Sequence, residues 1–415
     1  MKLKILIFLT MLSFNFYLFS ADENLEKLLK ESLEANPGIS AIEYQIKALQ
    51  EKEIFVQKLM DPMIAIEYSN VPFESWKLDE SAMSGIQFKL MQTVPFPGKN
   101  SKRKAVAQSE KQVKNWELEE LKLQLSGEIK KAYYQLGLNR KLKANSVKHI
   151  KLLEDLIEAI IHKYETGKSA QSDILQMTLM KDKLQDDLED FKLKEKEIQA
   201  ILNSILNRDI NTFISTKSVE SDLNMEFDFD TLLEIAKQNN PLLKKINEMS
   251  KMKRLSFLQA KSERLPDITL WIGYRYRKDV GMMKNEDLVS VGFSFPIPLD
   301  LKGRTKAKMN NAKFMEKTVD ENYKNTFNKI SEMILAATSG LERTKNKINN
   351  YQDNLIPDAE RIFRSVLTSY ETGRANFADL YQSQLQLIQF EKILINSKYK
   401  YKIYETTIGI LVGGK

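Results

Sequence analysis

The chain has 415 residues, of which 42% are hydrophobic and 29% charged, and its formal net charge is +7. This length allows two or three ordinary domains or one elongated domain, and the absence of cysteine excludes disulfides, thiolate chemistry and a lipid anchor on cysteine. Basic and acidic residues alternate along most of the sequence, which argues against a nucleic-acid partner. His149 and His162 lie 13 residues apart in one helical pattern; we interpret both as surface residues and expect no metal site.

Residues 1–21 have the pattern of a secretory signal peptide. Lys2 and Lys4 precede an apolar run from Ile5 to Phe19, and Ser20-Ala21 supplies small residues at the expected cleavage site. The run is shorter than the roughly 20 apolar residues of a membrane-spanning helix. We therefore expect the rest of the chain outside the inner membrane, either soluble or as a β-barrel.

The remaining sequence repeats one plan twice. The stretch "EANPGISAIEYQ" (34–45) pairs with "QNNPLLKKINEM" (238–249), and "YETGK" (164–168) pairs with "YETGR" (370–374). We predict repeat one over residues 22–210, a linker over 211–226 and repeat two over 227–415. Each repeat begins with a helical pattern that stops and restarts at an Asn-Pro pair.

Four strands are predicted, two in each repeat, at about 61–71, 83–95, 266–278 and 287–297. Apolar and polar residues alternate in them, as in "DITLWIGYRYR" (267–277), and the polar face carries Gln87, Lys89, Arg275 and Arg277. Such segments are typical of membrane β-barrels, although a soluble antiparallel sheet with one wet face has the same pattern. Four strands cannot close alone, so we expect three copies to share twelve strands around a lumen.

Long helical hairpins follow the strands, at about 99–206 and 303–412. Their second helices carry mostly apolar seams that match position by position, as Leu184 and Leu188 match Phe390 and Leu394. At the hairpin tips, Gly167 and Gly373 are expected to end one helix, and Ser169 and Asn376 to begin the next. Without the strands and the signal peptide, these patterns would equally fit a soluble coiled-coil rod.

Four stretches together resemble the outer-membrane efflux protein family, the TolC-like channels: "SLEANPGI", "QTVPFPGKNSKRK", "YETGKSAQSDIL" and "YETGRANFADLY". The resemblance implies an α+β membrane protein in which long helical hairpins form a periplasmic α-barrel and a homotrimer forms a 12-stranded β-barrel in outer-membrane lipid of a Gram-negative-type cell. It also implies two protein partners, a periplasmic adaptor protein and an inner-membrane pump of the RND or ABC type.

The same resemblance places a gate at the periplasmic tips. The matching positions are Tyr164, Gly167, Asp173, Tyr370, Gly373, Arg374, Asp379 and Gln382. Three copies of Asp379 are expected to form a ring that favours cations. Some family members carry a second acid at the position of Gln382, so a double acidic ring is not expected here. The lumen of the barrel is expected to be lined by Gln87, Lys89, Arg275 and Arg277.

The function indicated is the exit duct of a tripartite efflux system for small molecules or metal ions. A duct for type I protein secretion is the neighbouring alternative, and a soluble periplasmic coiled-coil structural protein is the alternative from another class. No enzyme activity and no cofactor are expected, because the sequence shows no nucleophile–base pair and no cofactor fingerprint. "PFPGKNS" (95–101) lacks the first glycine and the Ser or Thr that a phosphate loop requires.

Overall fold

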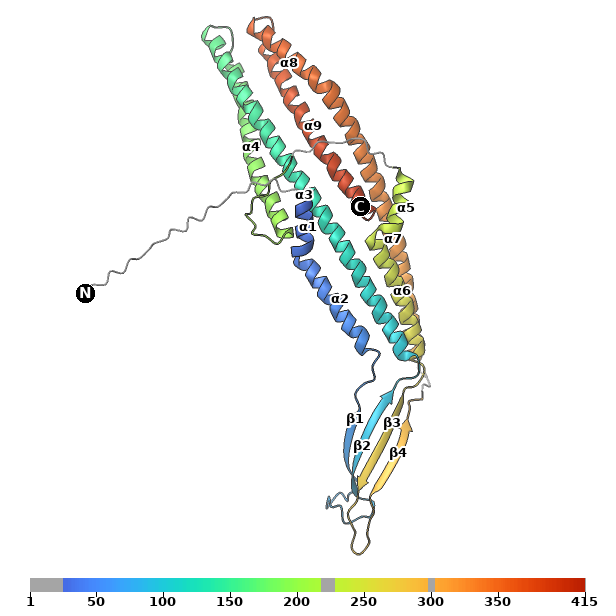
Figure 1. Ribbon diagram of the computed structural model, residues 1–415. Helices are drawn as coiled ribbons and strands as arrows, with labels where there is room; N and C mark the ends of the chain where they lie inside the picture. The colour runs from blue at the N-terminus through green and yellow to red at the C-terminus, as the bar shows by residue number, and fades with distance from the viewer. Residues whose placement is uncertain (1–24, 218–227, 298–302, 415) are drawn as a thin grey trace, which may run out of the picture. The chain divides into compact units, whose positions relative to one another are not determined.

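The computed structural model describes residues 25–217, 228–297 and 303–414, so the predicted signal peptide and most of the predicted linker lie outside the described residues. Figure 1 shows the two halves of the chain with the same order of elements. The first half contains α1 (Leu25–Ala35), α2 (Pro37–Phe55), β1 (Met63–Ser69), β2 (Gly85–Val94), α3 (Lys99–Glu165) and α4 (Gln171–Ile205). The second contains α5 (Phe229–Asn239), α6 (Pro241–Ser262), β3 (Ile268–Tyr276), β4 (Leu288–Ser294), α7 (Arg304–Asn350), α8 (Ile356–Glu371) and α9 (Phe377–Leu411).

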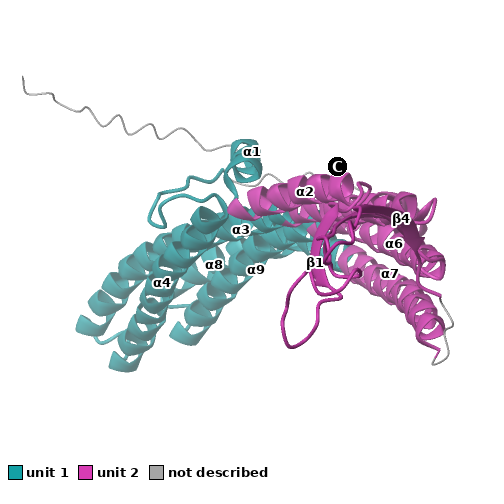
Figure 2. Cartoon of the chain, turned by 90° about the horizontal axis from the view of Figure 1, so that it is seen from below, with its two compact units in different colours: residues 1–36, 125–225, 340–406 teal, residues 37–124, 226–339, 407–415 magenta. Residues whose placement is uncertain are grey.

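The chain divides into two compact units that cut across the sequence repeats (Figure 2). Unit 1 comprises residues 1–36, 125–225 and 340–406, and unit 2 comprises residues 37–124, 226–339 and 407–415. Unit 1 thus combines the tip-proximal helices of both repeats, and unit 2 combines all four strands with the helices next to them. Both repeats contribute to each unit: in unit 1 their helices bury apolar side chains against one another, and in unit 2 their strands pair in one sheet.

The four strands form one antiparallel sheet in the order β1-β2-β3-β4. One row of facing residues runs Ile66, Phe88, Tyr274 and Val289, and the next runs Ile64, Leu90, Ile272 and Val291. Because side chains alternate between faces, the register gathers most apolar residues of the four strands on one face, while Met63, Met91 and Trp271 share a row on the other.

The Asn-Pro pairs tie the start of each repeat to its end. In unit 1, the Asn36 amide donates to the Ile205 carbonyl oxygen at 3.0 Å. In unit 2, the Asn240 amide donates to the Leu411 carbonyl oxygen at 2.8 Å, while its Oδ1 accepts from the backbone N–H of Leu242 at 2.9 Å. Asn240 therefore caps α6 and satisfies a carbonyl that the end of α9 leaves without a helical partner.

The "PFPGK" stretch attaches the sheet to α3 within unit 2. Gly98 has φ +87°, a left-handed conformation that favours glycine. Lys99 is 5% exposed, and its Nζ lies 2.7 Å from Asp267 Oδ1, which also accepts from the backbone N–H of Phe96 at 3.0 Å. The lysine at this position is thus a structural cation at the junction of α3 and β3, where a phosphate loop would present it to a ligand.

The core of unit 1 lies along the seam between the helices. Met177, Leu184, Leu380 and Leu387 are buried in one cluster with residues of α3 and α8. In the second repeat, the π-helix Tyr351–Leu355 separates α7 from α8, where α3 runs unbroken. Pro357, in the first turn of α8, has no N–H to donate into the preceding turn, which accounts for the local change of winding. No helix in the described ranges is long and apolar enough to cross a membrane.

Candidate functional site

The two hairpin tips in unit 1 have the same backbone geometry. Gly167 and Gly373 have φ values of +72° and +76°, and each ends its helix as the C′ residue. The N–H of Gly167 donates to the Tyr164 carbonyl at 2.9 Å, and that of Gly373 to the Tyr370 carbonyl at 3.1 Å. In each tip the N–H of the residue after the glycine donates to the carbonyl five residues earlier, as in Arg374 N–H to the Ser369 carbonyl at 2.7 Å. These bonds satisfy the final carbonyls and turn the chain sharply.

The helices that leave the tips begin differently. Asn376 caps α9 as its position indicated, because its Oδ1 accepts from the Asp379 N–H at 2.8 Å. Ser169 was expected to cap α4, but the N-cap residue is Ala170 and the capping group is Asp173. The Asp173 carboxylate accepts from the Ala170 N–H at 3.1 Å and from the Ser169 hydroxyl at 2.8 Å. An alanine cannot cap, so the acid three residues later does so in its place.

The two tip tyrosines have different environments. Tyr370 is 6% exposed, whereas Tyr164 is 46% exposed. The Lys163 ammonium lies 4.1 Å from the centroid of the Tyr370 ring and donates to the Tyr370 carbonyl. The Tyr370 hydroxyl lies 3.4 Å from the Ser169 hydroxyl. These contacts join the first tip to the second through Ser169 of the tip turn and through Lys163 of α3, which the repeat pattern does not single out.

The other predicted tip residues lie at the surface of unit 1. Asp379 and Gln382 are exposed on the first turns of α9, and Asp379 has no ion-pair partner among the described residues. Arg374 is also exposed, and its Nε donates to the Thr372 hydroxyl at 3.1 Å. An acid in the first turn of a helix interacts favourably with the helix dipole, so Asp379 stabilises the start of α9.

In unit 2, the polar face of the sheet brings three of the predicted lumen residues together. Lys89 Nζ lies 2.9 Å from Glu67 Oε2, and Arg275 Nη2 donates to Gln87 Oε1 at 2.8 Å. Gly273 faces Lys89 and leaves room for the Gln87 amide, which would lie 3.1 Å from an added Cβ. The face therefore carries paired charges and amides.

Arg277 lies elsewhere, one residue past the end of β3. Its backbone N–H donates to Asp287 Oδ1 at 3.0 Å, its Nε to the Glu286 carbonyl at 2.7 Å, and its Nη1 to the Ala82 carbonyl at 3.3 Å. The side chain therefore joins the two loops at this end of the sheet. The alternating pattern does not show where a strand ends, so the sequence did not reveal that Arg275 lies within β3 and Arg277 beyond it.

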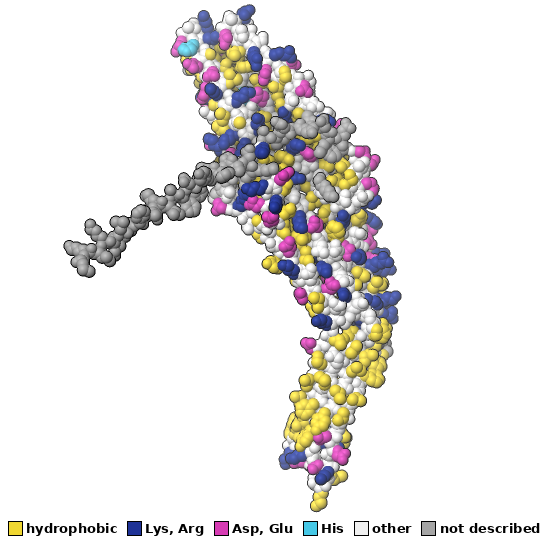
Figure 3. All heavy atoms as spheres, in the orientation of Figure 1, with side chains coloured by type: hydrophobic (Ala, Val, Ile, Leu, Met, Phe, Trp, Pro, Cys, Tyr) yellow, Lys and Arg dark blue, Asp and Glu magenta, His cyan; other side chains and the backbone are white. Residues whose placement is uncertain are grey.

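The opposite face of the sheet is apolar and open to solvent in the single chain. Ile64 is 74% exposed, Val291 75%, Val289 70% and Phe293 67%. Figure 3 shows hydrophobic side chains gathered over the strands, with charged side chains near the end of the sheet that carries the loops. At that end the Tyr68 and Trp76 rings stack with their centroids 6.4 Å apart. Exposed apolar surface of this kind marks contact with a membrane or a partner.

The surface assignment of His149 was wrong. His149 is fully buried between α3 and α9, whereas His162 is exposed as expected. The His149 Nε2 lies 2.8 Å from Glu391 Oε2, and the His149 Nδ1 lies 3.2 Å from the Gln384 amide nitrogen. Burial raises the pKa of the Glu391 carboxyl, but the hydrogen bonds from His149 and Lys148 outweigh it and hold the pKa below its usual value. Only the helix packing shows this network, because its members come from distant parts of the sequence.

The comparison with protein families assigns the second half of the chain. Residues 232–414 match the family described as "Outer membrane efflux protein". The match lies within the second repeat. The resemblance read from the tip, Asn-Pro and "PFPGK" stretches is thereby confirmed, and the first half repeats the order of elements that the family match covers. No curated protein sequence matches the chain.

Solved structures of outer membrane channels share the fold over nearly the whole chain. The outer membrane protein VceC from Vibrio cholerae is 16% identical with a TM-score of 0.78, covering 94% of this chain and 96% of VceC. CusC is 13% identical with a TM-score of 0.80, covering 95% and 93%. The CmeC outer membrane channel of Campylobacter jejuni is 16% identical with a TM-score of 0.77, covering 95% and 86%. The predicted fold class, with long helical hairpins and four strands per chain, is confirmed.

Proposed function

We propose that the protein is the exit duct of an efflux system in the outer membrane, built from three copies of this chain. The observation that carries the proposal is the sheet, which has an exposed apolar face and a polar face with paired charges. Its two edge strands, β1 and β4, pair with no further strand among the described residues. A lipid bilayer covers the apolar face, and only pairing of the edges satisfies their backbone groups there.

The strand order allows closure by copies of the same chain. With four strands in alternating directions, β4 of one copy runs antiparallel to β1 of the next, so a ring continues the same hydrogen-bonding pattern. Two copies would give eight strands, whose side chains fill the interior, whereas three give twelve and leave a lumen. Lys89, Gln87 and Arg275 would then line that lumen, and the hairpin tips would stand at its periplasmic end.

The duct would receive small molecules or metal ions from an inner-membrane pump of the RND or ABC type through a periplasmic adaptor protein. This assignment rests on the family match and on the fold shared with the outer membrane channels. Transport by the reconstituted assembly would separate it from type I protein secretion, since only a secretion duct would pass a whole polypeptide.

The first experiment measures molar mass by light scattering in membrane extracts made with and without detergent. A particle of three chains that requires detergent, and conducts ions in a planar bilayer, is the expected result. A particle of one or two chains that is soluble without detergent would refute the proposal and favour a periplasmic coiled-coil protein.

Within this duct, Asp379 would form the acidic ring at the entrance. Three copies of an exposed carboxylate would raise the local cation concentration, as rings of acids do in other channels. Asp379→Asn should reduce the cation preference of the conductance. Asp155→Asn is the control, because Asp155 is an exposed acid of α3 outside the predicted gate positions. Equal ion selectivity in the wild type and Asp379→Asn would exclude the ring.

A further inference from the structure

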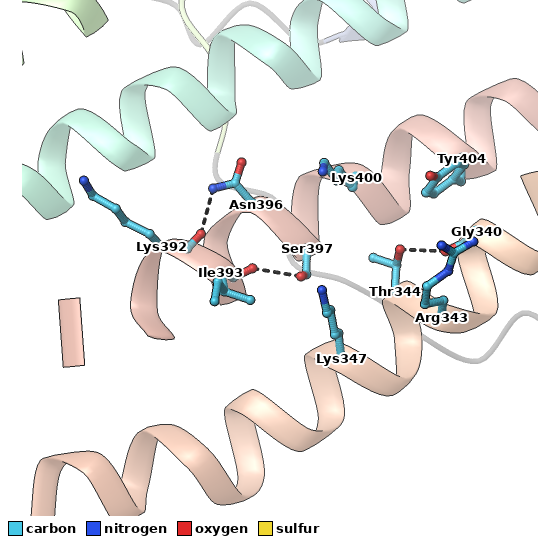
Figure 4. Close-up of a pocket in the computed structure, with 10 residues that line it drawn as sticks. All are labelled: Gly340, Arg343, Thr344, Lys347, Lys392, Ile393, Asn396, Ser397, Lys400 and Tyr404. Carbon is cyan, nitrogen blue, oxygen red and sulfur yellow. Dashed lines mark hydrogen bonds between the residues drawn. The ribbon is translucent and has the colours of Figure 1, made fainter. Parts of the chain in front are cut away.

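A groove with basic lining lies between α7 and α9 in unit 1 (Figure 4). Its volume is about 380 Å³. Arg343 and Lys347 enter it from α7, one turn apart, and Lys392 and Lys400 enter it from α9. No carboxylate is among the described residues that line it. The Thr344 and Ser397 hydroxyls and the Asn396 amide donate to carbonyls of their own helices, so they do not bond to the four cations.

One of these cations already has a partner in the same chain. Lys392 Nζ lies 2.6 Å from Asp187 Oδ2 of α4. Arg343, Lys347 and Lys400 have no ion pair with any residue in the described ranges. Three cations collected in one groove repel one another, and a set of carboxylates would relieve that repulsion.

The chain carries such a set on the outer face of α4. Asp182, Asp186 and Asp190 recur every four residues and are exposed on the side away from the buried face of that helix. None of the three has an ion-pair partner within the described part of the chain. We call these residues the α4 acidic stripe.

The stripe and the groove lie at the same distance from the hairpin tips. Both α4 and α9 have 35 residues and begin directly after their tip turns. Asp186 and Lys392 each occupy the sixteenth position, and Asp190 and Asn396 the twentieth, which places them about 22–28 Å from the helix start at ~1.5 Å per residue. When copies are related by rotation about an axis along the hairpins, residues equally far from the tips meet at one level.

The apolar residues that flank the two charged regions also correspond. On α4, Leu175 and Leu179 precede the stripe with exposed fractions of 61% and 69%, and Ile201 follows it at 52%. On α8, Ile362 is 50% exposed and lies nine residues before the end of its helix, much as Leu179 lies eight residues after the start of α4. Each side therefore has exposed apolar side chains between the tip and its charged region, and the two charged regions have opposite sign.

We propose that the α4 acidic stripe of one copy docks against the basic groove of the next copy, so that Asp186 and Asp190 pair with Lys347 and Arg343. The inference rests on the proposed trimeric duct, because it identifies how neighbouring copies recognise each other outside the sheet. The occupant of the groove is a second copy of this chain, chosen by charge complementarity and by the shared level along the hairpins.

A charge-swap experiment in the full-length protein tests the contact. Asp186→Lys with Asp190→Lys should raise the protein concentration for half-assembly of trimers in detergent at least about tenfold, and so should Arg343→Glu with Lys347→Glu. Combining all four substitutions should restore assembly to within about threefold of the wild type, because the pairs reform with reversed sign. The control is Asp155→Lys with Glu158→Lys, which reverses two exposed acids of α3 outside the stripe.

Molar mass, helicity from circular dichroism and bilayer conductance are measured for every variant. The contact is supported if the wild type is trimeric and conducting, both double charge reversals weaken trimer assembly, and the quadruple variant assembles again. If the wild type is trimeric and conducting but neither reversal weakens it more than the α3 control, the contact is refuted while the duct stands. Failure of the variant with all four substitutions to recover trimer assembly also refutes the pairing. A wild type that is neither trimeric nor conducting overturns the proposed function itself.

Discussion

Replacing Glu391 by glutamine should destabilise the helical unit in a pH-dependent manner. The Glu391 side chain is 11% exposed and accepts from the fully buried His149 and from Lys148, both at 2.8 Å. Glutamine keeps the shape and can still accept from His149, but it removes the charge that strengthens both bonds. A hydrogen bond to a charged group contributes about 1.5–3 kcal/mol, so we expect Glu391→Gln to lose roughly 2 kcal/mol at pH 7.

The direction of the pH effect follows from the lowered pKa of Glu391. A carboxyl whose folded pKa lies below its ordinary value of 4.5 contributes stability above that pH. This contribution decreases as the pH falls from about 4.5 through the folded pKa and is absent below it. The wild type and Glu391→Gln should therefore differ at neutral pH and converge in acid.

Thermal unfolding followed by circular dichroism from pH 3 to 7 would measure the difference. The chain provides a matched control in the exposed pair of His162 and Glu165, whose side chains are 70% and 64% exposed at 3.4 Å. Glu165→Gln should leave the unfolding temperature unchanged, because exposed ion pairs contribute little. A constant offset between the wild type and Glu391→Gln across the whole pH range would refute the reasoning.

Three further substitutions test the packing of unit 1. Gly340→Ala should lower the free energy of unfolding in chemical denaturation by about 1–3 kcal/mol, because the added Cβ would lie 2.6 Å from the Tyr404 ring. Gly409→Ala is the control: its added Cβ meets nothing within 4 Å, so this variant should not be destabilised. Arg140 donates to Glu195, to the Thr216 hydroxyl and to the Ile214 carbonyl at 2.7, 3.0 and 2.7 Å. Arg140→Ala should therefore make residues 206–217 accessible to proteolysis and lower the free energy of unfolding by about 3 kcal/mol. Unchanged cleavage would contradict this. Lys163→Met should loosen the contact with the second tip, which hydrogen exchange would detect as faster exchange in residues 369–375; equal rates would show that the lysine does not hold the tips together.

Local chemistry in the sequence was sufficient to predict the elements and the tip turns. A glycine after "YET" supplies the positive φ that the C′ position needs, and apolar alternation distinguishes a strand with one lipid-like face from a helix. The repeated spacing showed that both halves follow one plan. These features depend on residues close together in the chain, so they can be predicted from the sequence alone.

The tertiary structure decided which of two equivalent residues does what. Tyr370 is buried under Lys163 while Tyr164 is exposed, although both stand in the same motif. His149 is buried opposite Glu391, which lies 242 residues away in the chain, and the compact units combine parts of both repeats. The helical period shows that a helix has a buried face but does not identify the partner of that face, and the partner decides whether a polar residue lies in water or in a network.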